Sequence, residues 1–158
     1  MLNKEKIRKK FLKIRKNNYY EVNKKFFEPL ITFLNKKFKN KKFNLSFYYP
    51  TNYEVNTLKL IELLSNKKNI TTLLPLTNSN KMMSFTKWSF LDILKVNKFG
   101  ILEPIKIKKN LVPHVSLVPL LAYDKRKFRL GYGKGYYDKY FNKYLKLNKN
   151  ITTIGVAF

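Results

Sequence analysis

The chain has 158 residues and no cysteine, and 34 basic against 9 acidic residues give it a formal net charge of +25. This length suits one domain with a real core, and the lack of cysteine excludes disulfides, thiolate nucleophiles and cysteine-based zinc sites. No apolar run is long enough to span a membrane, and the first 15 residues lack the apolar core of a signal peptide, so we expect a cytoplasmic protein without a membrane partner.

The positive charge has two interpretations. It would attract a polyanion such as nucleic acid, membrane phosphate or a polyglutamylated substrate. Alternatively, Lys, Asn, Ile, Phe and Tyr are enriched together, as coding from an AT-rich genome would produce, and the lysines are scattered over every segment. We prefer compositional drift. A nucleic-acid-binding protein stays open as the alternative, because cationic grooves with aromatic platforms bind single strands.

Two helices are predicted in the first quarter of the chain. In residues 3–17, apolar side chains recur at i, i+4 and i+7 and basic residues cover the other faces. Lys4 and Arg8 lie four positions apart and therefore share a face of this helix. Residues 21–38 form the second predicted helix, in which Pro29 either introduces a kink or marks the first turn of a new helix.

A strand–helix–strand unit follows. Residues 44–49 are rich in aromatic side chains and predict a strand, and residues 54–64 predict a helix with Glu54 in its first turn. Residues 70–74 predict a second strand, closed by Pro75. This order is typical of parallel strands joined by a crossover helix.

The remaining elements complete an α/β domain. Further strands are predicted at residues 82–88, 115–120 and 151–158, with a loop at 99–104 and a polar turn at 124–128. We expect a single-domain, three-layer sandwich over residues 1–158, with a mixed or mostly parallel central sheet and helices on both faces. The ligand crevice should lie at the strand ends.

The most unusual stretch is the glycine loop, residues 129–138, with the sequence RLGYGKGYYD. It holds three of the five glycines of the chain, at every second position, and an aromatic helical pattern begins at Tyr136. Glycine tolerates positive φ and lets another group approach the backbone. A loop that leads into a helix N-terminus is suited to phosphate, although a tight turn is an alternative explanation of the three glycines.

Charged residues in and beside this loop strengthen the phosphate interpretation. Arg129 and Lys134 supply positive charge suited to a polyphosphate. Asp138 falls in the first turn of the predicted helix, where it would hold a metal ion carried by the phosphates. The spacing matches neither the P-loop nor the dinucleotide fingerprint.

Four motifs together resemble the 5-formyltetrahydrofolate cyclo-ligase family. Residues 118–124 (VPLLAYD) and the glycine loop are similar to its main signature, except that Leu120 stands where the family often has Gly. Lys4-Glu5-Lys6-Ile7-Arg8 fits its N-terminal K-x-x-x-R. Glu54-Val55-Asn56-Thr57 fits its E-[VI]-x-T, and residues 99–104 fit its F-G-I-x-E-P.

The resemblance implies a reaction. The family uses MgATP to convert 5-formyltetrahydrofolate into 5,10-methenyltetrahydrofolate, with release of ADP and phosphate. The formyl oxygen attacks the γ-phosphate to give a phosphorylated imidate, N10 then closes the ring, and phosphate leaves. Phosphoryl transfer depends mainly on positioning and charge stabilisation, which suits a chain without cysteine and with a single histidine.

The resemblance also implies a distribution of roles. Arg129 and Lys134 would be the catalytic cations, and Asp138 would hold Mg²⁺. The ATP site would comprise Lys4, Arg8, Arg129, Leu130, Gly131, Tyr132, Gly133, Lys134, Gly135, Tyr136 and Tyr137. The folate site would comprise Tyr49, Glu54, Met83, Tyr132 and Tyr136. Phe85 and Trp88 are further candidates near the pterin, and core packing is the simpler explanation for these two and for Met83.

The resemblance covers residues 4–158, but family members usually continue with an acidic residue that contributes to the metal site and a final strand. This sequence has no counterpart of that C-terminal segment. A protein that keeps the family fold and binds folate without catalysis is therefore a second alternative, beside the basic RNA-binding protein. We expect a monomer that binds 5-formyltetrahydrofolate and MgATP.

Overall fold

The computed structural model describes residues 3–64, 66–78, 82–147 and 150–158. A five-stranded sheet has the strand order β3-β2-β1-β6-β9. Its strands are β1 (Phe43–Ser46), β2 (Ile70–Thr77), β3 (Met83–Lys87), β6 (Val115–Pro119) and β9 (Thr152–Val156). β2, β1, β6 and β9 run parallel, and β3 is an antiparallel edge strand. The sheet is therefore mixed and mostly parallel, as predicted.

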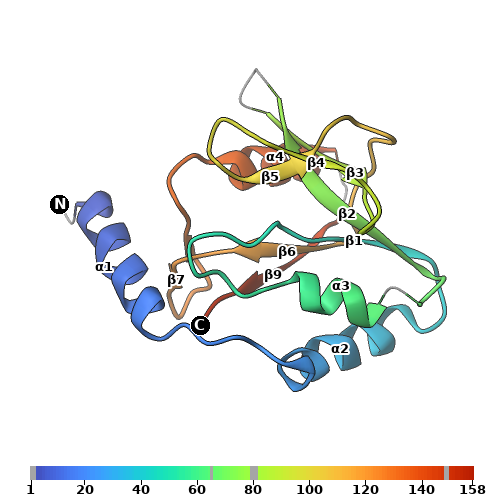
Figure 1. Cartoon of the computed structure of the whole chain (residues 1–158), viewed down its shortest axis with the longest axis horizontal. Helices are drawn as coiled ribbons and strands as arrows, with labels where there is room; N and C mark the ends of the chain where they lie inside the picture. Colours follow the sequence, from blue (N-terminus) through green and yellow to red (C-terminus); the bar gives the residue numbers. More distant parts are fainter. Residues whose placement is uncertain (1–2, 65, 79–81, 148–149) are drawn as a thin grey trace.

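Helices cover both faces of this sheet (Figure 1). The 3₁₀ helix η1 and the helices α2 and α3 lie on one face, and α4 lies on the other. Helix α1 stands to one side, beyond the strand ends from which the glycine loop emerges. The bounds are α1 (Lys4–Asn17), η1 (Lys24–Phe27), α2 (Glu28–Phe38), α3 (Leu58–Leu64) and α4 (Tyr136–Lys146). The three-layer prediction is confirmed.

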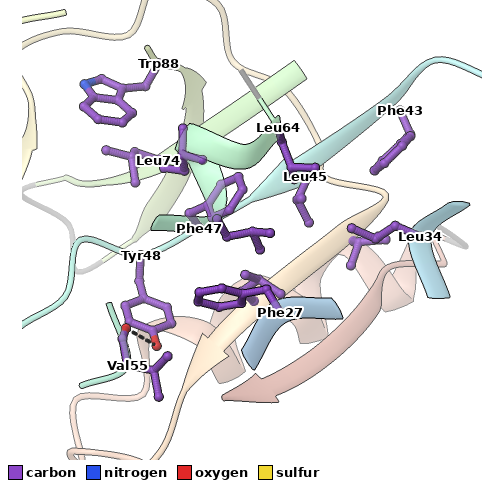
Figure 2. Packing of buried hydrophobic residues seen from close by; sticks show 14 of the residues in the cluster. Phe27, Leu34, Phe43, Leu45, Phe47, Tyr48, Val55, Leu64, Leu74 and Trp88 are labelled. Carbon is purple, nitrogen blue, oxygen red and sulfur yellow. Dashed lines mark hydrogen bonds between the residues drawn. The ribbon is translucent and has the colours of Figure 1, made fainter. Parts of the chain in front are cut away.

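Two hydrophobic cores fill the spaces between these layers. The larger core packs η1, α2 and α3 against the sheet, with Phe27, Leu34 and Phe47 at its centre (Figure 2). The smaller core packs α4 against β2 and β3 through Leu73 and Tyr140, among others. Both faces of the central strands are thus buried, as expected for parallel strands joined by crossover helices.

The connections between strands position the ligand site. From β1 the chain passes through α3 to β2 on one side, and from β6 it passes through α4 to β9 on the other. The strand order therefore reverses between β1 and β6, and open α/β sheets bind ligands at the carboxyl ends of strands where this happens. No helix within the described ranges is long and apolar enough to cross a membrane.

Two predicted helices differ from the observed ones. The helix predicted at residues 21–38 is divided into η1 and α2, and Pro29 lies in the first turn of α2, so the second of the two alternatives for Pro29 is correct. The helix predicted from residue 54 begins only at Leu58. The Thr57 hydroxyl donates to the Tyr48 carbonyl at 2.7 Å, and the Asn56 side chain accepts from the Leu58 N–H, which holds the preceding residues in a loop.

Two strand ends were also predicted incorrectly. β1 stops at Ser46, earlier than the predicted end at residue 49. β2 does not close at Pro75 but continues to Thr77. Proline is tolerated there because β2 pairs with β1 only up to Leu73, so no β1 carbonyl needs an N–H group from Pro75.

Two short hairpins extend from the main sheet. One joins β4 (Leu94–Val96) to β5 (Leu102–Pro104), and the other joins β7 (Ala122–Tyr123) to β8 (Arg129–Leu130). Neither was predicted as strands, because each strand is only two or three residues long. The first hairpin carries residues 99–104, and the second delivers the chain into the glycine loop.

Candidate active site

A cavity of about 1090 Å³ lies at the carboxyl ends of β1 and β6. Every residue that the sequence analysis assigned to ATP, folate or the metal lines it. These residues are Lys4, Arg8, Tyr49, Glu54, Met83, Arg129, Leu130, Gly131, Tyr132, Gly133, Lys134, Gly135, Tyr136, Tyr137 and Asp138. The structure thus brings these residues together from four separated segments of the chain, and residues of the loop at 99–104 line the same cavity.

The glycine loop has the backbone conformation that a phosphate site needs. Gly133 and Gly135 have φ of 93° and 70°, in the left-handed region that favours glycine. Gly135 is the N-cap of α4 and has no side chain to cap the helix. The first N–H groups of α4 are therefore free of a side-chain acceptor at the cap, and such groups bind anions.

Helix α1 is joined to this loop through Arg8. The Arg8 Nε donates to the Gly131 carbonyl at 3.0 Å, and a Cβ placed on Gly133 would lie 3.0 Å from the Arg8 Cζ. The guanidinium therefore lies directly against the bare backbone of Gly133. Lys4, one helical turn earlier, lines the same cavity. Of the pair expected on one helix face, Arg8 contacts the glycine loop and Lys4 lines the same cavity.

The loop at residues 99–104 forms the facing wall. The Lys134 Nζ lies 5.7 Å from the centre of the Phe99 ring, and Phe99 packs edge-to-face on Tyr136. Glu103 is buried at 4% exposure and accepts hydrogen bonds from the Thr77 N–H, the Thr77 hydroxyl and the Asn97 amide. Its carboxylate joins β5 to the end of β2, so we assign Glu103 a structural role.

Glu54 is the most unusual ionisable group of the cavity. Its side chain is only 5% exposed, and its carboxylate accepts from the Thr51 N–H at 2.9 Å and from the Tyr132 hydroxyl at 2.8 Å. Burial raises the pKa of Glu54 to about 7, although the two hydrogen bonds and the charge of Arg15 act in the opposite direction. A carboxylate that titrates near neutrality inside a cavity is typical of a functional site.

The prediction that Glu54 is a first-turn helical acid was wrong, because the helix starts four residues later. Arg15, which is connected to Glu54 through the Tyr132 hydroxyl, was not among the predicted site residues. Arg15 is 4% exposed and donates to the Tyr132 hydroxyl. In the sequence it is one of many cations in α1, and its burial depends on contacts with the distant Leu120 and Tyr132, so no local signal marked it.

The aromatic and methionine candidates of β3 separate into two groups. Met83, the first residue of β3, belongs to the smaller core and also lines the cavity. Phe85 is fully buried against Tyr140 in the smaller core, and Trp88 belongs to the larger core. For Phe85 and Trp88 the simpler explanation, core packing, is therefore the correct one.

Asp138 lies in the first turn of α4, as predicted, and forms an ion pair with Arg129. Within the described ranges, no group of three or more His, Asp or Glu side chains could enclose a metal ion. Mg²⁺ is commonly bound by one or two carboxylates together with substrate phosphates. The carboxylate of Asp138, which lines the cavity at the start of α4, fits an ion of that kind and does not form part of a cage made only of protein groups.

The fold and the cavity define an α/β protein with a glycine-rich loop at a helix N-terminus beside a buried carboxylate. The model of the 5-formyltetrahydrofolate cyclo-ligase family matches residues 1–158. The chain therefore belongs to the 5-formyltetrahydrofolate cyclo-ligase family.

Individual relatives agree with this assignment. A 5-formyltetrahydrofolate cyclo-ligase from Haemophilus influenzae is 30% identical over 122 residues, which are 73% of this chain and 63% of the relative. The solved structure of 5,10-methenyltetrahydrofolate synthetase from Aquifex aeolicus has a TM-score of 0.70 and 31% identity, over 100% of this chain and 78% of that one. A synthetase structure from Mycoplasma pneumoniae, with a TM-score of 0.69 and 23% identity, supports the fold. It covers 99% of this chain and 85% of that one.

Proposed function

We propose that this chain, as a monomer in the cytoplasm, cyclises 5-formyltetrahydrofolate to 5,10-methenyltetrahydrofolate at the expense of ATP. One observation carries the proposal: a single cavity joins a glycine loop at a helix N-terminus to a buried carboxylate that titrates near pH 7. The first feature suits a polyphosphate and the second suits a polar heterocycle with N–H donors.

The cations of the cavity would bind and orient the triphosphate. Lys4 and Arg8 enter the cavity from α1, and Lys134 belongs to the glycine loop itself. The leaving ADP and the transferred phosphoryl group are both anionic, so fixed cations and backbone N–H groups stabilise the charge that develops between them. Arg129 and Lys134 are the proposed catalytic pair. Asp138 would hold Mg²⁺, which neutralises phosphate charge when it is bound.

Glu54 would position the folate. An ionised carboxylate accepts two hydrogen bonds from neighbouring N–H groups, as a pterin ring offers them. Met83, Tyr49 and the ring of Tyr136 would supply apolar contacts around it. With both ligands in place, the formyl oxygen attacks the γ-phosphorus as the bond to ADP breaks. N10 then adds to the activated formyl carbon and releases its proton to solvent, and phosphate leaves with the former formyl oxygen.

Turnover tests this proposal directly. Purified protein is mixed with 5-formyltetrahydrofolate and MgATP, and the methenyl product is followed by its near-UV absorbance, with omission of ATP as the control. ATP-dependent formation of product supports the proposal. Absence of product from a folded sample that still binds folate favours a non-catalytic member of the family fold. Absence of folate binding together with steeply salt-dependent RNA binding favours the nucleic-acid alternative.

A further inference from the structure

Arg15 is a buried cation for which the proposed reaction has no direct use. It lies in the last turn of α1 and is 4% exposed, whereas the neighbouring Lys13 and Lys16 are exposed. Burial of a guanidinium is costly unless it has partners. Its partners are the Leu120 carbonyl at 3.4 Å and the Tyr132 hydroxyl, and its Cζ lies 5.3 Å from the centre of the Tyr132 ring.

The contact with Tyr132 continues to Glu54. The Tyr132 hydroxyl accepts from Arg15 and donates to the Glu54 carboxylate at 2.8 Å. A phenol has one proton, and arginine only donates, so the hydroxyl proton is directed to Glu54 whenever Arg15 is in place. The connection joins residues that are 117 and 78 positions apart in the chain. Tyr132 and Glu54 line the cavity, and Arg15 is not among the described lining residues.

We propose that Arg15 is a positioning residue for folate: it holds the Tyr132 hydroxyl on Glu54 and so fixes the carboxylate that receives the pterin. This inference rests on the proposed function, because it takes folate as the ligand of Glu54. Arg15 acts through Tyr132 and touches no ligand. It also fastens the end of α1 to the glycine loop, so the folate side and the phosphate side share one support.

The charges around Glu54 make the inference measurable. Four groups face this carboxylate: Arg15 from α1, Tyr132 from the glycine loop, Tyr48 from the segment after β1 and Tyr137 from α4. The charge of Arg15 and the hydrogen bond from Tyr132 both lower the pKa of Glu54. Removal of Arg15 abolishes the effect of its charge on this pKa. It also leaves the Tyr132 hydroxyl without the contact that directs its proton to Glu54.

The first experiment needs no substrate. Glutamate carboxyl carbons are labelled with ¹³C, the Glu54 signal is assigned with Glu54→Gln, and its titration is followed by NMR in the whole chain. We expect Arg15→Met to move the Glu54 midpoint to higher pH, and Arg15→Lys to move it less because the charge remains. Lys13→Met removes an exposed cation from the same turn and should leave the midpoint unchanged. An unchanged midpoint in folded Arg15→Met overturns the proposal.

The second experiment measures binding of 5-formyltetrahydrofolate and of ATP separately by calorimetry. Arg15→Met should weaken folate binding about tenfold, as loss of a charge-supported hydrogen bond does, and ATP binding less than threefold. If Arg15→Met does not fold, Tyr132→Phe breaks the same connection with Arg15 still present and should show the same selective loss. Equal weakening of both ligands, or no weakening of folate, overturns the proposal. Failure of the unmodified chain to bind folate contradicts the proposed function instead, and the NMR titration separates the two cases.

Discussion

The two halves of the cavity are built in opposite ways. The half that we propose binds phosphate, here called the phosphate half, is one continuous stretch, residues 129–138, which combines a hairpin strand, three glycines and the first turn of a helix. Its ion pair between Arg129 and Asp138 is partly open to solvent. The other half, which we propose binds folate and call the folate half, is arranged around Glu54. Tyr132 of the glycine loop and Arg15 behind it support this carboxylate, so three distant segments contribute, and Glu54 and Arg15 are both buried.

This difference has a physical consequence. In the phosphate half, backbone N–H groups would bind the ligand, so binding depends most on the conformation of Gly133 and Gly135. Its charged side chains are partly exposed, so they cost little free energy of folding. In the folate half, burial of a carboxylate and a guanidinium costs free energy that only well-placed partners offset. We therefore expect the phosphate half to be sensitive to backbone changes and the folate half to be sensitive to pH.

The largest effect should come from Gly133→Ala. The new Cβ would lie 3.0 Å from the Arg8 Cζ, and the backbone φ of 93° is strained for any other residue. Both the anion site and the docking of α1 would be disturbed. We expect ATP-dependent turnover to fall about a hundredfold or more, comparable to loss of a main stabilising group in a transition state.

Gly131→Ala is the matched control for this substitution. A Cβ there meets no atom within 4 Å, and the φ of Gly131 is outside the left-handed region. Turnover of Gly131→Ala should stay within about threefold of the unmodified chain. Equal losses in the two variants would show that any side chain in the loop blocks the ligand, and that the conformation of Gly133 is not the cause.

The second effect concerns the folate half and its dependence on pH. The pKa of Glu54 is about 7 in the folded chain against a usual value of 4.5. Between these values the folded state binds more protons than the unfolded state, so this carboxylate lowers stability as pH rises. Between pH 4.5 and about pH 7, this carboxylate lowers the free energy of unfolding by about 3 kcal/mol in total.

Glu54→Gln removes this titration. Relative to the unmodified chain, the variant should gain about 2–3 kcal/mol in free energy of unfolding between pH 5 and pH 8, as measured by urea denaturation at each pH. Folate affinity should rise through pH 7 in the unmodified chain, as the carboxylate ionises, and stay flat in the variant. A constant stability difference from pH 5 to pH 8 would contradict the raised pKa.

The contrast between the halves also explains what the sequence could predict. The glycine loop, its flanking cations and the first turn of α4 are close together in the sequence. Spacing alone therefore predicted that Asp138 lies in the first turn of α4 and that Arg129 and Lys134 lie beside the glycines. Lys4 and Arg8 were placed on one helical face by their spacing, and the resemblance supplied their direction towards the loop.

The folate half was predicted less completely, because its geometry depends on contacts between distant segments. Glu54 was expected on a helix, and the hydrogen bond from Thr57 to the Tyr48 carbonyl, which delays that helix, cannot be seen in residue spacing. Nothing local distinguishes Arg15 from the other cations of α1. Strand order likewise depends on long-range pairing, although the α/β class and both helical layers follow from the order of the predicted elements.

A third prediction tests the support beneath the folate half. Gly155 lies on the edge strand β9, and a Cβ there would come within 2.4 Å of the Leu120 side chain. The Leu120 carbonyl accepts a hydrogen bond from Arg15. Gly155→Ala should lower the free energy of unfolding by about 1–3 kcal/mol through overpacking, as measured by urea denaturation.

The matched variants for Gly155→Ala use the neighbouring side chain. Leu120→Ala removes the obstructing methyl groups, so Gly155→Ala should cost less in that background than in the unmodified chain. The coupling between the two substitutions should exceed about 0.5 kcal/mol, as for other residues in contact. Strict additivity would mean that β9 shifts away and that Leu120 does not support Arg15.

The smallest effect on stability should come from Asp138→Asn. Asp138 is 66% exposed at its side chain, and its ion pair with Arg129 lies at the cavity mouth, where solvent screens charge. Loss of an exposed pair costs less than about 1 kcal/mol, so the urea midpoint should hardly change. The Mg²⁺ concentration that supports half-maximal turnover should nevertheless rise severalfold, because an amide is a weaker ligand for this ion than a carboxylate.

From the comparison between the halves, we expect Asp138→Asn to change the Mg²⁺ requirement without changing the stability. A group in the phosphate half can be lost without unfolding, since its neighbours are backbone groups and exposed cations. Lys139→Gln, one residue further along α4 and exposed, is the control and should change neither quantity. An unchanged Mg²⁺ requirement in Asp138→Asn would mean that the role of Asp138 is to orient Arg129. In that case Arg129→Lys should reproduce any remaining loss of turnover, since lysine cannot form the planar two-point contact of arginine with a phosphate.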